Sequence, residues 1–411
     1  MIAADKPSYR WVVAATAFTI YFFTNGMAIF VPQNLFPRLM EEFSVTAGEV
    51  SRVTFVTLLF SAFLAPLAGF LIDRFGVVRI IRFGLLVMLA CFALYPFVQS
   101  IQQLYVIHAF LSLGLVCSGL MSNVVLLTAW FSKGRGSVVG LLASGSSLAG
   151  AALPLMIAPL VLDPEFGWRW GFGSLSIGFL VFAFLPGFLL MRAPQNAAPT
   201  GEAPTPTDGV ELSEAVRHVT LWALAVGSAC LWFCIQAMNS QISIFFEQEA
   251  ALTPGKATLL FSVIFWFSFF GKFLFGAVSD LLPKRRVMQI ASSLLFAGCL
   301  LLFDFSGSDL TLTRKVGQLT AFAVVFGLGF GGSFTMIQLV AVESFGQRAL
   351  GKILGIIVFI DSIGAALGTA LTGQLRTSTG DYTIPFIMVS AVALVAVVAV
   401  SMIKPLQKQS S

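Results

Sequence analysis

About a dozen apolar runs, each roughly 20 residues long, follow one another along the chain, and short charged or Pro/Gly-rich segments separate them. A helix needs about 20 apolar residues to cross the hydrocarbon core of a bilayer. Only 10% of the residues are charged, whereas roughly a quarter are charged in a typical soluble domain. A large soluble core would account for one or two such runs but not for a dozen. The sequence therefore predicts an all-α membrane protein.

The charged and Pro/Gly-rich segments divide the chain into twelve candidate transmembrane helices. These are residues 11–32, 49–72, 79–99, 102–130, 135–161, 169–191, 219–246, 257–279, 287–305, 316–342, 352–374 and 383–403. Between the sixth and seventh spans, the segment 192–217 is rich in proline and small residues, which is typical of a solvated linker. We therefore predict two six-helix bundles, at 1–191 and 218–411, joined by a cytoplasmic linker at 192–217.

The distribution of Lys and Arg sets the expected orientation. With the N-terminus inside, sixteen of the 24 Lys and Arg residues fall in cytoplasmic segments and seven in outer segments, and Lys272 alone lies within a span. Cytoplasmic loops of membrane proteins carry such an excess of positive charge. We expect both termini in the cytoplasm and a lipid-embedded monomer in the plasma membrane, which is the inner membrane in a bacterium.

Other classes of function find little support. The net charge of +5 comes from short basic segments between spans, not from a basic stripe, so we expect no nucleic-acid partner. All five cysteines lie inside apolar spans without metal-ligand spacing. The glycines at 327–332 follow no strand and precede no Gly-Lys-Ser/Thr, so they indicate close helix packing and not a nucleotide loop. We expect no metal, no cofactor, no catalytic residue and hence no enzyme.

The two halves of the chain repeat each other. Gly69–Arg79 follows the second span, and Gly276–Arg286 stands at the equivalent place after the eighth. The entries to spans five and eleven agree as well, with an Arg followed by spaced glycines from Arg135 and from Arg348. Repeated six-helix halves are a known construction of transporters, with the substrate site at the interface of the halves.

These motifs resemble those of the major facilitator superfamily. Gly69–Arg79 matches the superfamily signature G-x-L-x-D-R-x-G-x-x-R, whereas the second copy departs from it with Leu281 and Pro283. The resemblance covers nearly the whole chain. It implies the major facilitator fold of twelve transmembrane helices in two pseudo-symmetric six-helix bundles, and it implies transport by alternating access.

Three further segments resemble the monocarboxylate porter and oxalate/formate antiporter branch. They are Trp130–Gly150 at the entry to span five, Arg217–Trp222 at the entry to span seven, and Leu371–Tyr382 at the exit of span eleven. Thr24-Asn25-Gly26 stands where many monocarboxylate porters carry an aspartate. The branch implies a small organic anion as substrate.

Lys272 and Asp361 are the ionisable residues deepest within the spans. An ionised side chain at mid-bilayer costs about 3 kcal/mol or more, so it normally faces a cavity. Lys272 lies eight residues before Asp280, and Asp361 lies nine residues after Lys352. At 1.5 Å per residue, both are about 12–13 Å inside their helices. We expect a Lys272–Asp361 ion pair, either direct or bridged by water.

The resemblance assigns Lys272 a role, and a role for Asp361 follows from it. Lys272 aligns with an arginine on span eight that grips the substrate carboxylate in the relatives. Asp361 is then the proton-coupling residue, because it loses its partner when substrate takes Lys272 and a buried, uncompensated carboxylate takes up a proton. The alternative is that Lys272 only neutralises Asp361 and fixes the packing of the helices.

Softer candidates for substrate binding are uncharged polar residues inside the spans. They are Tyr21, Asn25, Asn123, Ser146, Gln236, Asn239 and Gln338. Gln236 and Asn239 are three residues apart and therefore project from one helical face. For each of the seven, the alternative is a hydrogen bond between helices with no role in binding.

Four residues at loop entries are candidates for a cytoplasmic gate: Asp73, Arg74, Arg135 and Asp280. An acidic side chain stabilises a helix N-terminus. We expect Asp73 to cap span eleven and Asp280 to cap span five, which would hold the gate shut in the outward-open state.

The sequence thus favours a secondary transporter that moves a small, monocarboxylate-like anion, with proton symport favoured over exchange. Two alternatives remain open. One is an exporter of amphipathic or drug-like compounds, for which the 42 phenylalanines would line the cavity. The other is a membrane sensor that has the same fold and does not transport.

Overall fold

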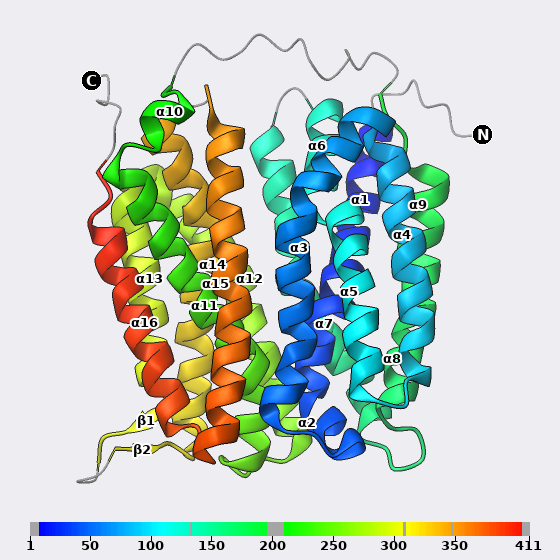
Figure 1. Ribbon diagram of the computed structural model, residues 1–411, viewed down its shortest axis with the longest axis vertical. Helices are drawn as coiled ribbons and strands as arrows, with labels where there is room; N and C mark the ends of the chain where they lie inside the picture. The colour runs from blue at the N-terminus through cyan, green and yellow to red at the C-terminus, as the bar shows by residue number, and fades with distance from the viewer. Residues whose placement is uncertain (1–7, 132–133, 195–208, 307–309, 347, 405–411) are drawn as a thin grey trace. The chain divides into compact units, whose positions relative to one another are not determined.

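The computed structural model describes residues 8–131, 134–194, 209–306, 310–346 and 348–404, and nearly all of them are helical (Figure 1). The described residues form two compact units. Unit 1 takes them from Met1–Phe43 and Phe63–Ala203, and unit 2 takes them from Ser44–Ala62 and Pro204–Ser411. Most of the predicted linker, residues 195–208, lies outside the described residues.

Unit 1 is built from the helices of the first half of the chain. They are α1 (Tyr9–Asn25), the π-helix η1 (Gly26–Phe30), α2 (Val31–Phe43), the second half of α3 (Ala47–Phe75), α4 (Val77–Leu94), the 3₁₀-helix η2 (Tyr95–Phe97), α5 (Ile101–Ser118), α6 (Leu120–Trp130), α7 (Arg135–Val161), α8 (Gly167–Phe179), the π-helix η3 (Leu180–Phe184) and α9 (Leu185–Leu190). Gly76 separates α3 from α4 with a φ of 86°, a conformation that favours glycine. The positive φ accounts for the second glycine of the Gly69–Arg79 motif, Gly76.

Unit 2 contains the first half of α3 and the helices of the second half of the chain. These are α10 (Leu212–Ala215), α11 (Val219–Gln248), α12 (Pro254–Leu281), α13 (Lys284–Leu300), α14 (Val316–Phe345), α15 (Leu350–Thr379) and α16 (Thr383–Ser401). A two-stranded antiparallel sheet, β1 (Phe303–Asp304) with β2 (Thr311–Leu312), lies between α13 and α14 in the chain. Within the unit, α11 packs beside α15, and α14 packs beside both α12 and α13 (Figure 1).

Eleven segments of the described chain are long and apolar enough to cross a membrane. The ninth predicted span, 287–305, corresponds to α13, which has 17 residues and ends at Leu300. On α16, Leu394, Val395 and Val398 are about half exposed, whereas Val389 and Ala393 are buried. Aliphatic side chains on the outer surface of a helix bundle are favourable in lipid. The fold is therefore that of an integral membrane protein.

The glycines of α14 bring it close to two neighbouring helices. A Cβ on Gly331 would lie 2.1 Å from the Ser268 carbonyl oxygen of α12, and a Cβ on Gly329 would lie 2.5 Å from the Leu295 nitrogen of α13. Only glycine permits backbones to approach so closely. The predicted role of these glycines in helix packing is confirmed.

Several predicted spans are interrupted, which the sequence did not indicate; η3 interrupts the sixth, and the first and fourth hold candidate residues. In the first span, η1 follows Asn25 directly, and α2 continues the helix to Phe43. In the fourth, Gly119 breaks the helix between α5 and α6, and the Asn123 amide donates to the carbonyls of Ser118 (2.8 Å) and Gly119 (2.7 Å) at the break. Irregular turns inside helices are frequent at functional sites.

Candidate functional site

A polar stripe runs along one face of α11 in unit 2. Its members are Ser228, Trp232, Gln236, Asn239 and Ser243, spaced three or four residues apart, so they share a face. Asn239 Nδ2 donates to Gln236 Oε1 at 3.4 Å, which brings together two of the predicted binding residues. Asn239 Oδ1 and Ser243 Oγ are buried and have no hydrogen-bond partner within the described chain. A buried polar atom without a partner is costly, so these two atoms are available to a ligand or to water.

Asp361 faces this stripe from α15. Its Oδ1 accepts a hydrogen bond of 2.5 Å from Ser228 Oγ, and both side chains are buried. The approach of the helices depends on Gly364 and Gly368, where a Cβ would lie 2.4 and 2.2 Å from carbonyl oxygens of α11. The small residues on α15 therefore set the Ser228–Asp361 contact.

Lys272 is buried on α12 and contacts residues of α14. Its Nζ lies 4.2 Å from the centroid of the Phe334 ring, within the range of a cation–π interaction. The Lys272 backbone is also held, because Thr335 Oγ1 donates to its carbonyl oxygen at 3.3 Å and a Cβ on Gly331 would lie 2.9 Å from its nitrogen. The position of the ammonium is thus coupled to the packing of α12 against α14.

Trp232 connects the surroundings of the two ionisable residues. Its ring centroid lies 5.9 Å from that of Phe334, the ring beneath the Lys272 ammonium. Trp232 is one helical turn from Ser228, the hydrogen-bond donor to Asp361. Ser228, which contacts Asp361, and Trp232, which contacts the Phe334 ring, are therefore about 6 Å apart along α11, at 1.5 Å per residue. The direct ion pair between Lys272 and Asp361 stays a prediction.

The remaining candidates of unit 2 lie toward the ends of their helices. Gln338 is exposed on α14, one turn beyond Phe334. Asp280 is exposed in the last turn of α12. Neither belongs to the buried group around Trp232.

In unit 1, the structure brings together two of the predicted binding residues. The side chains of Tyr21 on α1 and Ser146 on α7 form a hydrogen bond, and both residues are buried. One turn along α1, Thr24 Oγ1 and Asn25 Oδ1 are buried without a hydrogen-bond partner in the described chain. Asn25 is the residue directly before η1, so a cluster of polar groups stands at the irregular turn. Asn123, in contrast, directs its amide to the α5–α6 break.

The gate candidates of unit 1 are found at helix ends. Asp73 and Arg74 are exposed in the last turn of α3, and the Arg74 guanidinium lies 5.7 Å from the centroid of the Phe75 ring. Arg135 begins α7, and its Nε donates to the Phe131 carbonyl oxygen at 2.6 Å. The expected capping contacts of Asp73 and Asp280 stay predictions.

Sequence reasoning missed Ser228, Trp232 and Phe334, which lie near Lys272 and Asp361. A signal for two of them was present, since Ser228 and Trp232 precede Gln236 by eight and four residues and so fall on the same helical face. Phe334 is one of 42 phenylalanines, and its sequence context does not distinguish it.

A second polar network lies at the C-terminal end of α11, the end farther from Arg217. Glu249 Oε1 lies 3.2 Å from Arg376 Nε in an ion pair without hydrogen-bond geometry, and its Oε2 accepts from the Tyr382 backbone at 3.3 Å. Tyr382 Oη donates to Gln241 Oε1 at 2.9 Å. Burial raises the pKa of Glu249, and the Tyr382 N–H and Arg376 oppose that rise. Protonation of Glu249 would therefore weaken its contacts with Arg376 and with the Tyr382 N–H.

Comparisons with known proteins agree with this architecture. Residues 18–253 and 242–410 match the Major Facilitator Superfamily. The chain is 25% identical to monocarboxylate transporter 4 of Mus musculus, over 96% of this chain and 83% of the mouse protein. It is 24% identical to an agnestins efflux protein of Paecilomyces divaricatus, over 76% of this chain and 68% of the fungal protein.

Among solved structures, a bacterial homologue of the human lysosomal transporter Spinster has the same fold. It superimposes with a TM-score of 0.73 over 97% of this chain and 96% of its own, at 16% sequence identity. Identity at that level carries the fold alone.

Proposed function

Because the chain belongs to the Major Facilitator Superfamily, we propose that it carries a small organic anion across the membrane by alternating access. It is an integral membrane transporter and not an enzyme. The proposed cargo is a monocarboxylate-like anion that moves together with a proton.

The observation that carries the proposal is the buried ammonium of Lys272. An ionised side chain inside a span normally faces a cavity, and a carboxylate is the natural ligand of an ammonium. The Phe334 ring lies against the ammonium, and Trp232 contacts that ring, so an apolar wall adjoins the charge. A short organic acid matches this combination with its carboxylate on Lys272 and its carbon chain on the aromatic side chains.

Asp361 is the proposed proton site. As a carboxylate it accepts a hydrogen bond from the Ser228 hydroxyl. When Asp361 is protonated, the same hydroxyl rotates to accept a hydrogen bond, because serine is both donor and acceptor. Ser228 thus serves both forms of the carboxyl group. Substrate bound at Lys272 neutralises the ammonium, after which a charged Asp361 is uncompensated and takes up a proton.

Unit 1 holds a separate cluster of polar groups, which we propose as further substrate contacts. Asn25 and Thr24 have unpartnered buried oxygens beside η1, and the Tyr21–Ser146 pair lies one turn away. Thr24 Oγ1 offers a hydroxyl that can donate or accept, and Asn25 Oδ1 offers an acceptor. The carrier is proposed to work as a monomer with both termini in the cytoplasm.

Uptake into proteoliposomes tests the proposal. We expect radiolabelled acetate, pyruvate or lactate to accumulate when the outside is acidic and to equilibrate without a pH gradient. The variant Lys272→Gln is expected to abolish uptake while the purified protein stays monodisperse. The matched control is Lys256→Gln, an exposed lysine in the first turn of the same helix, and it should transport normally. Near wild-type affinity in Lys272→Gln would exclude the binding role.

The second candidate function is export of amphipathic compounds. Its support is the match to a fungal efflux protein and the aromatic cluster of Trp232, Phe330 and Phe334. The same vesicles distinguish the two functions. An exporter would transport a fluorescent lipophilic anion or cation, and other apolar compounds would compete with that transport. It would not transport acetate.

A further inference from the structure

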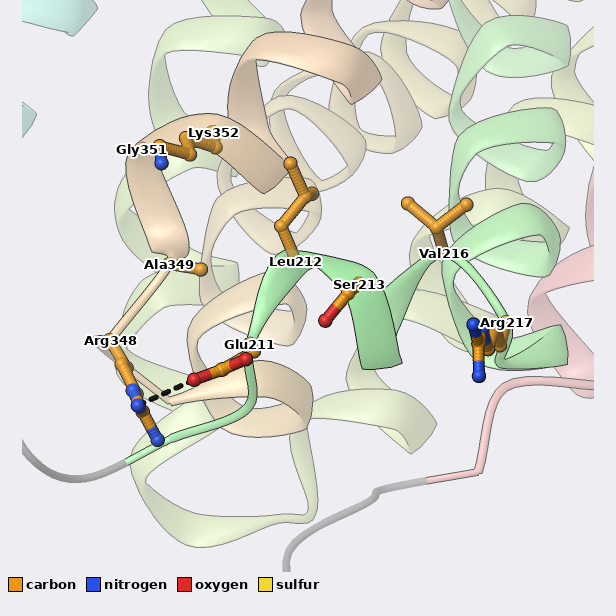
Figure 2. Close-up of a pocket in the computed structure, with 9 residues that line it drawn as sticks. All are labelled: Glu211, Leu212, Ser213, Val216, Arg217, Arg348, Ala349, Gly351 and Lys352. Atoms are coloured by element: carbon orange, nitrogen blue, oxygen red, sulfur yellow. Dashed lines mark hydrogen bonds and ion pairs between the residues drawn. The ribbon is translucent and has the colours of Figure 1, made fainter.

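A groove with basic walls lies at the end of unit 2 where α11 begins. Its volume is about 850 Å³, and its lining includes Arg217, Arg348, Lys352, Glu211 and Ser213. Figure 2 shows Lys352 in the first turn of α15, Arg217 before the start of α11, and α10 between them. The volume lies within the range of pockets that hold small molecules.

The walls of the groove are fixed to each other. Arg348 and Glu211 form an ion pair of 2.6 Å across it (Figure 2). The Val210 backbone donates to the Phe345 carbonyl oxygen at 2.9 Å, which ties the segment before α10 to the end of α14. The groove is therefore shaped before any ligand arrives, which lowers the entropic cost of binding.

The charge of the groove selects an anion. Three basic side chains and one acidic side chain line it, an excess of two positive charges. Arg348 is engaged by Glu211, so Arg217 and Lys352 are the cations that face the groove without that neutralisation. Two separated cations and the Ser213 hydroxyl suit a ligand with several acceptor oxygens, such as a phosphate group.

An exposed tryptophan adjoins the groove through Val216, one of its lining residues. Trp222, in the first turn of α11, is 47% exposed, and its indole N–H donates to the Val216 carbonyl oxygen at 2.9 Å. Exposed tryptophans mark the membrane–water interface. The described chain also returns to this end after α16, where Thr220 Oγ1 donates to the Lys404 carbonyl oxygen at 2.7 Å. The proposed topology makes this the cytoplasmic end, where anionic lipid headgroups meet basic pockets.

We propose that this groove binds a phosphate group, presented by the headgroup of an anionic phospholipid or free in solution, through basic residues of its lining such as Arg217 and Lys352. An excess of positive charge is ordinary on a cytoplasmic surface. The preformed walls and the interfacial tryptophan distinguish this groove from such a surface. The proposal also gives the Arg217–Trp222 motif a physical role.

Thermal unfolding of the purified full chain in a neutral detergent measures this binding. Short-chain phosphatidylglycerol, short-chain phosphatidylcholine and inorganic phosphate are titrated separately. We expect a saturable rise in the melting temperature with phosphatidylglycerol and not with phosphatidylcholine. A rise with inorganic phosphate alone also supports the site and identifies the free anion as its ligand.

Variants locate the site. Arg217→Gln and Lys352→Gln are each expected to weaken binding about fivefold, the effect of one basic residue near an anionic headgroup. Arg286→Gln, an exposed arginine of α13 outside the groove, is the control and should bind as the wild type does. Glu211→Gln removes the negative charge and is expected to strengthen binding, a gain that misfolding does not produce.

Two results would overturn the proposal. One is that neither phosphatidylglycerol nor phosphate shifts the melting temperature of the wild type. The other is that Arg217→Gln, Lys352→Gln and Arg286→Gln weaken binding equally while Glu211→Gln leaves it unchanged, since binding would then follow total charge and not the groove.

Discussion

Replacing Gly331 by alanine tests whether the packing of α12 against α14 sets the position of Lys272. The new Cβ would lie 2.1 Å from the Ser268 carbonyl oxygen and 2.9 Å from the Lys272 nitrogen. An ordinary contact needs more than 3 Å, so the two helices must separate locally by about 1 Å. This movement displaces the backbone that carries the ammonium.

The effect on stability follows from two opposing terms. Overpacking of this kind costs about 1–3 kcal/mol, and alanine recovers up to about 1 kcal/mol of helix propensity relative to glycine. We expect a net loss of about 1–2 kcal/mol and a lower melting temperature in detergent.

The effect on substrate binding follows from Coulomb's law. If an ammonium–carboxylate separation grows from about 3 to about 4 Å at an effective dielectric constant of about 20, the attraction falls by about 1.4 kcal/mol. We therefore expect KM for anion uptake to rise about tenfold.

Two glycines of the same helix serve as controls. A Cβ on Gly317 meets nothing within 4 Å, so Gly317→Ala should leave both stability and KM near the wild-type values. A Cβ on Gly329 meets α13 at 2.5 Å, away from α12, so Gly329→Ala should lower stability without raising KM. An unchanged KM in Gly331→Ala, or an equal rise in Gly329→Ala, would refute the link between this packing and Lys272.

Three further predictions concern single carboxyl groups. Asp361→Asn keeps the shape but does not ionise, so it should abolish pH-driven accumulation and retain exchange; accumulation with wild-type proton dependence would contradict the proton role. Asp73→Asn, at the exposed end of α3, should lower the maximal rate more than the affinity, which initial rates over a range of substrate concentrations would show. Glu249 has a pKa raised by burial, so its contribution to stability is complete below about pH 4.5 and is lost as pH rises through the raised value. In Glu249→Gln, the fall in melting temperature between pH 4.5 and 8 should be smaller than in the wild type, and an equal fall would exclude this carboxyl as its source.

The sequence determined the spans and the family. The bilayer fixes the length of an apolar helix, so runs of about 20 residues locate the helices without knowledge of their neighbours. The glycines of α14 were identified as packing residues because they follow no strand and precede no Gly-Lys-Ser/Thr, so the nucleotide-loop alternative fails. Lys272 and Asp361 were found because ionisable residues are rare inside apolar runs and can be recognised from the sequence alone.

The tertiary structure alone decided which side chains surround those two residues. Helices such as α11 and α14 are apolar around most of their circumference, so their hydrophobic pattern does not fix their rotation about the helix axis. Whether Ser228 meets Asp361, and whether Phe334 meets Lys272, depends on that rotation and on the close approaches at Gly364 and Gly331. The interruptions at η1 and Gly119 also depend on tertiary structure. The backbone N–H and C=O groups at such turns need hydrogen-bond partners, and helix packing decides which partners are within reach.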